Sequence, residues 1–157
     1  MRIVRIALAS IVLLAVTASA ATVRVSGPKA AQVMHERHEG MEAIGKAFKV
    51  LHREFDAGSP SVPTVRASAA RITALGKRSS GWFPAGTGPD VAKTGAKLEI
   101  WQNPQDFAAK LSAFQKAAFV FNAAAAGGDM NAAKARYADL GGTCKACHDK
   151  YRTEMHH

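Results

Sequence analysis

The sequence predicts an all-α protein that folds as an antiparallel up-down-up-down four-helix bundle. In four separate stretches, apolar residues recur at alternating spacings of three and four, which is the period of packed helices. Clusters of glycine, serine and proline divide these stretches, and no alternating run is long enough to form a strand. The length of 157 residues fits one domain, and 48% hydrophobic with 21% charged residues is ordinary for a folded protein. Two cysteines are too few for a disulfide-rich scaffold.

The first 20 residues are typical of a secretory signal peptide. Arg2 and Arg5 precede an apolar run over residues 6–16, and Ala18 and Ala20 form a small-x-small ending. An uncleaved anchor is the alternative, but the run is shorter than the ~20 residues that span a bilayer. We therefore expect cleavage after Ala20 and export to the periplasm. The mature domain would cover residues 21–157, with no membrane span.

The first two helices are expected over residues 29–56 and 62–78, because proline and glycine clusters flank both stretches. The first stripe holds Met34, Arg37, Met41, Ile44, Phe48, Leu51 and Phe55, and the second holds Val62, Val65, Ala69 and Ile72. Arg37 is a charge at a seam position, where burial needs a partner. Gly45 follows Met41 by one turn and leaves that face open. Three histidines fall off the first stripe and are expected to be exposed: His35, His38 and His52.

The last two helices are expected over residues 104–126 and from residue 130 almost to the C-terminus. Asn103 and Pro104 suit a helix start, and a Gly-Gly pair separates the two helices. Their stripes hold Phe107, Leu111, Phe114, Ala118 and Phe121, then Met130, Ala133, Tyr137, Leu140, Cys144, Cys147 and Tyr151. The irregular residues 81–103 precede them, with a helical turn expected near 91–97. Segments this long usually have a function.

Cys144-Lys145-Ala146-Cys147-His148 has the C-x-x-C-H spacing of a c-type haem attachment site. On a helix the two thiols share one face, so each can form a thioether with one vinyl group of a single haem. His148 then follows as the proximal iron ligand. The motif therefore predicts one haem c, attached covalently inside the bundle through Cys144 and Cys147.

Three other interpretations of the two cysteines are weaker. A disulfide between them would close a very short loop and stabilise little. A thioredoxin-like redox pair normally belongs to a βαβ unit, whereas this chain is predicted to be helical. A zinc site would need two further ligands, for which only His156 and His157 lie nearby, at the end of the chain.

With its haem motif on the last helix, the chain resembles the class II cytochromes c, the group of cytochrome c-prime and its low-spin relatives. The resemblance also includes Arg37-x-x-x-Met41, Phe83-Pro84-Ala85-Gly86-Thr87, Thr94-Gly95-Ala96 and Glu99-Ile100-Trp101, in that order. It implies that Arg37 lies near a haem propionate and that Arg152 lies beside the proximal histidine. A solvated basic helix end is an equal alternative for Arg152.

The residue four positions after the first-helix arginine decides the expected function. In the family this residue faces the distal side of the iron, and a methionine ligates the iron in the low-spin members. Because this chain has Met41, we expect a six-coordinate haem with His148 and Met41 as iron ligands. The protein would then be a one-electron carrier and not an enzyme. The alternative is a five-coordinate cytochrome c-prime that binds nitric oxide or carbon monoxide at a vacant distal site.

A formal net charge of +9 favours an acidic partner, a nucleic acid or a membrane surface. The basic residues are scattered over all four helices without a dense run, so nucleic-acid binding is not expected. Redox partner proteins with acidic surfaces suit this charge better. The family often pairs through its first two helices, so the resemblance also leaves a homodimer open.

Overall fold

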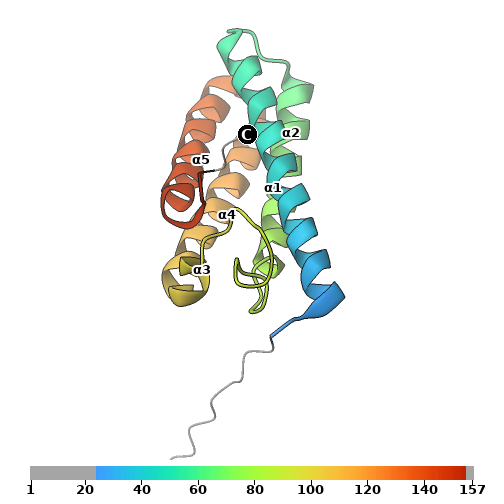
Figure 1. The fold of residues 1–157 in the computed structure, drawn as a ribbon. Coiled ribbons are helices and arrows are strands. Elements are labelled where there is room, and N and C mark those ends of the chain that lie inside the picture. The colour runs from blue at the N-terminus through green and yellow to red at the C-terminus, as the bar shows by residue number, and fades with distance from the viewer. Residues whose placement is uncertain (1–23, 155–157) are drawn as a thin grey trace, which may run out of the picture.

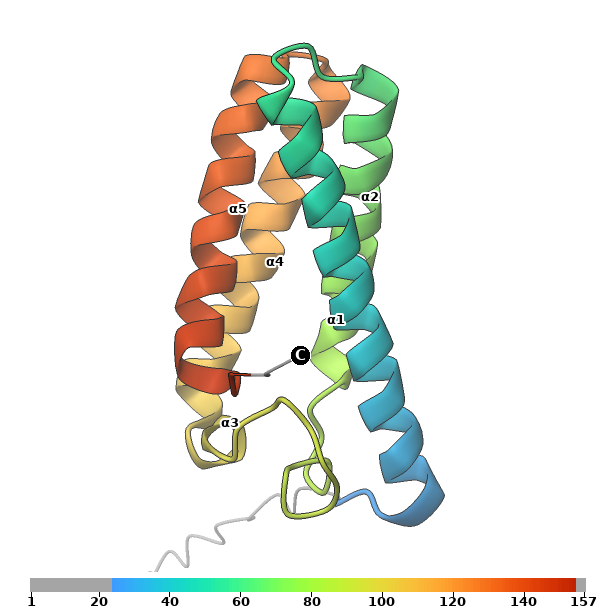
Figure 2. The ribbon, with the colours of Figure 1, turned by 45° about the horizontal axis from the view of Figure 1, so that its top comes forward.

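The structure is a computed structural model, and it describes residues 24–154. Four long helices build it: α1 (Gly27–Asp56), α2 (Val62–Arg78), α4 (Pro104–Gly127) and α5 (Met130–Tyr151). The 3-10 turn η1 (Ser79–Gly81) and the short helix α3 (Glu99–Gln102) lie between α2 and α4. The long helices run alternately up and down (Figures 1 and 2). The predicted all-α four-helix bundle is confirmed.

The predicted bounds of α1, α2 and α4 and the predicted start of α5 agree with the structure to within two residues. Side chains cap two helix starts: Ser61 Oγ accepts from the amide of Thr64, and Asp129 Oδ1 accepts from the amides of Asn131 and Ala132. Gly128 ends α4 in the left-handed region at φ 86°, which glycine adopts without a steric penalty. These local signals explain why the boundaries could be read from the sequence.

The predicted stripes form the core. Most stripe residues are buried, and the largest side chains with almost no exposure are Phe121, Leu51, Ile72, Leu140 and Val65. Each long helix contributes to one hydrophobic cluster, against which Met41, Phe48, Tyr137 and Cys144 are partly buried. Packing of this cluster joins α1 to α2, α2 to α4, and α4 to α5.

The segment from Trp82 to Leu98 covers the end of the bundle near the start of α1 (Figure 2). The helical turn expected near residues 91–97 is absent, and the short helix lies at Glu99–Gln102 instead. The backbone explains the difference, because the amide of Lys97 donates to the carbonyl of Tyr151 at 3.0 Å and Ala96 pairs with Arg152. Pairing with the end of α5 therefore replaces helical hydrogen bonds there.

Helices α1 and α5 contact each other at one end of the bundle and diverge toward the other (Figure 2). The rings of Phe48 and Tyr137 lie 4.3 Å apart, and Lys134 Nζ donates to the carbonyl of Phe55 at 3.2 Å. Further along, a Cβ added to Gly45 or Gly142 would meet no described atom within 4 Å. There is therefore room beside each of these two glycines, and Gly142 is exposed to solvent.

The signal peptide predicted over residues 1–20 lies outside the described residues. Within residues 24–154, none of the helices is long and apolar enough to cross a membrane.

Candidate functional site

The last two turns of α5 carry Cys144, Cys147 and His148. Both thiols are unpaired and half-buried, and they face different parts of the core. Cys144 packs against the main hydrophobic cluster. Cys147 packs against a second cluster of Ala96, Ile100, Phe107 and Tyr151. The spacing of three thus places both sulfurs on the inward side of α5, as predicted.

The protonation of these groups follows from their surroundings. Desolvation raises the pKa of the Cys144 and Cys147 thiols, so both are protonated at neutral pH. Desolvation, with the nearby charge of Arg152, lowers the pKa of His148. The imidazole is therefore held in the neutral form, which is the form that can bind a metal.

Contacts of Tyr151 and of Thr153 hold the end of α5 in place. The Tyr151 ring packs edge-on against Phe107 at 5.2 Å, and its hydroxyl donates to the carboxylate of Asp106. One residue beyond Arg152, the amide of Thr153 donates to the carbonyl of Gly95 at 2.9 Å. This strand-like pairing was not visible in the sequence, because it joins segments that are almost 60 residues apart.

The backbone of Arg152 contacts that of His148, and the charge of Arg152 affects the His148 imidazole. Its amide donates to the carbonyl of His148 at 3.0 Å, and its side chain is exposed. Both sequence interpretations of Arg152 fit this position, so its role at the haem stays a prediction.

Arg37 is buried, with 5% of its surface exposed, and its hydrogen bonds all go to the segment between α2 and α3. Nη1 donates to the carbonyl of Trp82 at 3.1 Å and to Oγ1 of Thr87 at 3.2 Å. Nη2 donates to the carbonyl of Thr87 at 2.9 Å and to Oγ1 of Thr94 at 3.0 Å. The guanidinium also faces the rings of Phe83 and Trp101, at 5.2 and 5.9 Å.

The partners of Arg37 are thus neutral oxygens and aromatic rings. Burial lowers the pKa of the guanidinium to about 10, which still leaves it charged at neutral pH. The implied contact with a haem propionate is untested, and it would have to be made in addition to these four hydrogen bonds.

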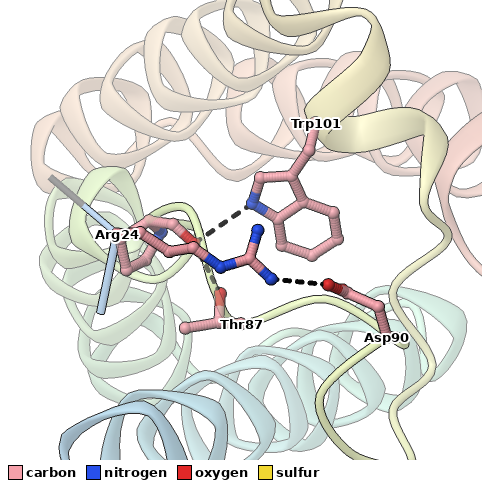
Figure 3. Close-up of polar contacts among 5 residues, drawn as sticks. Arg24, Thr87, Asp90 and Trp101 are labelled. Carbon is pink, nitrogen blue, oxygen red and sulfur yellow. Dashed lines mark hydrogen bonds and ion pairs between the residues drawn. The ribbon is translucent and has the colours of Figure 1, made fainter. Parts of the chain in front are cut away.

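Further contacts brace the same segment. Trp101 Nε1 donates to the carbonyls of Phe83 and Pro84, and Thr87 Oγ1 donates to the carbonyl of Pro84 at 2.9 Å. Figure 3 shows Thr87 and Trp101 beside the ion pair of Arg24 and Asp90, which measures 2.7 Å. These hydrogen bonds therefore hold the segment from Trp82 to Leu98 in one conformation at the end of the bundle.

Gly40 is a further residue that the sequence did not single out. A Cβ at this position would lie 2.2 Å from Cη2 of Trp82, so only glycine lets the indole reach α1. The spacing pattern drew attention to Gly45, where a Cβ meets nothing. The sequence feature that could have identified Gly40 is its position one turn before Ile44, on the side of α1 that is predicted to be buried.

Met41 is partly buried against the main core cluster, one turn before the open space at Gly45. The three histidines on α1 are exposed, as predicted. His38 lies 3.5 Å from Glu42, and His52 lies 3.2 Å from Asp56, each one turn along the helix. No histidine of α1 is therefore buried beside Met41.

The residues present fit a covalently attached haem. Two thiols three residues apart share the inner side of α5, and a neutral imidazole follows directly at the exposed His148. Gly142, two residues before Cys144, leaves room on α5 because a Cβ there would meet no described atom within 4 Å. Between residues 24 and 154 there is no group of three histidine, cysteine or carboxylate side chains placed to hold a metal ion by themselves.

A helical bundle with this motif on its last helix defines a c-type cytochrome. The family model described as Cytochrome C' matches residues 32–152. The chain therefore belongs to the cytochrome c' family, as the resemblance implied, and this family carries covalently attached haem c.

Relatives and solved structures agree with this family. Cytochrome c' from Pararhodospirillum photometricum is 32% identical over 116 residues, which cover 74% of this chain and 92% of the relative. Cytochrome c' from Alcaligenes xylosoxydans xylosoxydans is 41% identical over 68 residues, or 43% of this chain and 54% of the relative, so that match spans about half of its length. The crystal structure of cytochrome c' from Thermochromatium tepidum has a TM-score of 0.74 at 30% identity, covering 84% of this chain and 100% of that one.

Proposed function

We propose that this cytochrome binds nitric oxide or carbon monoxide at a haem whose iron has His148 as its one protein ligand. The observation that carries the proposal is the match of residues 32–152 to the Cytochrome C' family model. The family membership supports this function over the six-coordinate carrier expected from the sequence. A solved cytochrome c prime from Alcaligenes xylosoxidans, 26% identical with a TM-score of 0.72, is the nitric oxide complex of a variant.

In this proposal each residue has a separate task. Cys144 and Cys147 anchor the haem, and His148 supplies its neutral imidazole to the iron. A haem held by these residues would supply a ferrous iron that binds diatomic gases. Met41 would contribute an apolar side chain near it and not an iron ligand. Arg37 holds the covering segment, and Arg152 keeps a positive charge beside the proximal histidine.

The second candidate is the electron carrier with His148 and Met41 as axial ligands. It is favoured by one observation, that Met41 is a half-buried thioether next to open space on α1. Thioether ligation would raise the reduction potential and close the site to gases. In both candidates the protein is exported to the periplasm after loss of residues 1–20 and is not an enzyme. As a carrier it would exchange electrons with redox partner proteins.

A second copy of the chain is a further proposed partner, through α1 and α2. Side chains from both helices line a shallow groove on this face: Ala43, Lys46, Ala47, Val50, Ala67, Ser68 and Arg71. One similar solved structure, with a TM-score of 0.74 at 28% identity, is of a cytochrome c' with ligand-controlled dimer dissociation. Sedimentation of Ala67→Glu, compared with the unchanged chain, tests this face.

Optical spectra of the haem-loaded protein separate the two functions. We expect a high-spin ferric spectrum that Met41→Ala leaves unchanged, and rapid carbon monoxide binding to the ferrous protein at full occupancy. Met34→Ala is the matched control, because Met34 is the other half-buried methionine of α1. A low-spin ferric spectrum that becomes high-spin only in Met41→Ala would establish the carrier instead.

A further inference from the structure

The acidic residues of this chain are distributed unevenly. Helix α2 contains no aspartate or glutamate, and neither does α4 after Asp106. The same two stretches carry six basic residues: Arg66, Arg71, Lys77, Arg78, Lys110 and Lys116. Basic residues are scattered over the chain, as predicted, but acidic residues are missing from these two stretches. Apart from Asp106 in the first turn of α4, the pair α2–α4 therefore carries only basic charges.

Helices α2 and α4 lie side by side (Figure 2), and a groove of about 400 Å³ runs between them. Lys77 of α2 and Lys116 of α4 line it from both sides, together with Phe119. No carboxylate belongs to its lining. Of the ion pairs formed within residues 24–154, none involves Lys77 or Lys116.

Hydrogen bonds between the two helices hold the groove in shape. Gln115 Nε2 on α4 donates to the carbonyl of Gly76 at 2.9 Å and to Oγ of Ser80 at 2.8 Å. Thr73 Oγ1 on α2 donates to the carbonyl of Ala118 at 3.0 Å. A surface that is already ordered loses little conformational entropy when a partner binds.

Phe119 is an exposed aromatic side chain at this groove. It is 61% exposed, and its neighbour Val120 is 38% exposed. A phenylalanine in the middle of a helix gains free energy when a partner covers it, and aromatic residues are enriched in protein interfaces. An exposed phenylalanine with a lysine on either side suits binding of a folded acidic protein. A nucleic acid or an anionic lipid surface carries many phosphates and needs a denser set of basic residues.

We propose that the α2–α4 groove docks an acidic protein. Carboxylates of the partner would pair with Lys77 and Lys116, while an apolar side chain of the partner covers Phe119. The groove lies on the opposite side of the bundle from α1 and α5, because α2 packs on α1 and α4 packs on α5. Docking here leaves the haem side free, and the proposal stands whichever axial ligation the iron has.

The test measures binding of the haem-loaded protein to an acidic plant-type ferredoxin at low ionic strength. We expect Lys77→Glu with Lys116→Glu to weaken the affinity at least tenfold. Lys29→Glu with Lys49→Glu is the matched control, because these exposed lysines of α1 give the same change in net charge; it should weaken binding less than threefold. Phe119→Ser should weaken binding several-fold and leave its salt dependence unchanged.

Four results would overturn the proposal. The first is an absence of binding at low salt, and the second is an equal loss in both double variants, which would mean that net charge alone attracts the ferredoxin. The third is self-association that Phe119→Ser abolishes, because a second copy would then occupy the groove. The fourth is binding to anionic phospholipid vesicles, but not to ferredoxin, that depends on Lys77 and Lys116.

Discussion

Arg37 and Thr87 are joined by two hydrogen bonds, from Nη1 to Oγ1 at 3.2 Å and from Nη2 to the backbone carbonyl at 2.9 Å. They fasten α1 to a segment that is 50 residues away in the sequence. The guanidinium is buried without a carboxylate, so its charge is offset only by oxygen dipoles and two aromatic faces. The fold therefore depends on these contacts being made together.

Replacing Arg37 by lysine should lower the free energy of unfolding by about 2–4 kcal/mol. A single ammonium has no planar fork and leaves some of the four acceptors unpaired. Urea unfolding of the haem-loaded protein, followed by tryptophan fluorescence, measures the loss. Arg24→Lys is the control, since its exposed ion pair with Asp90 should contribute less than about 1 kcal/mol. Equal losses in the two variants would contradict the role given to Arg37.

Gly40 and Gly45 form a matched pair on one helix. Gly40→Ala should destabilise the protein by about 1–3 kcal/mol, because the new Cβ would overlap the Trp82 ring. Gly45→Ala meets no described atom, so it should leave the stability unchanged or raise it by up to about 1 kcal/mol. Thermal unfolding of both variants measures the difference. If Gly40→Ala were as stable as Gly45→Ala, the position of Trp82 against α1 would be wrong.

Asp106 makes the stability depend on pH at the end of α5. Hydrogen bonds from Tyr151 and Lys150 lower the pKa of this carboxyl from its ordinary 3.8. A lowered folded-state pKa means that the contribution is complete above the unfolded value and is lost as the pH falls through the folded one. Asp106→Asn should therefore be less stable than the unchanged chain near neutral pH, and the gap should close in acid.

Acid titration of the unfolding free energy measures this gap. Asp139→Asn is the control, because Asp139 makes only a surface pair with Arg136 at 2.9 Å. A gap for Asp106→Asn that stays constant from neutral pH to well below 3.8 would show that lost packing, rather than the carboxylate charge, causes the change.

The fold could be predicted from the sequence because its information is local. Helix caps, glycine stops and the spacing of apolar residues identify each helix and its buried face, as with Ile72 and Leu140. The thiols of Cys144 and Cys147 were placed correctly for the same reason. These patterns specify which face is buried, but they do not specify which atoms meet across the bundle.

The missed features all depend on contacts between distant segments. Contact with the Trp82 ring requires glycine at position 40 but not at position 45. The backbone carbonyls of Trp82 and Thr87 accept hydrogen bonds from Arg37. The end of α5 pairs with residues 95–97 and moves the short helix to Glu99–Gln102. The basic groove between α2 and α4 was also missed in the sequence. What distinguishes these helices is a lack of acidic residues, and not a dense run of basic ones.

The two thiols should hold the haem independently, since Cys144 and Cys147 pack against different clusters. Either single alanine variant should keep haem on the chain through the remaining thioether, and the double variant should release it all into acidified butanone. One vinyl group then stays conjugated in each single variant, so the pyridine haemochrome should absorb at a longer wavelength than in the unchanged protein. Lys145→Ala, an exposed change between them, should alter neither result. Haem that remains on the double variant after extraction would place the attachment elsewhere.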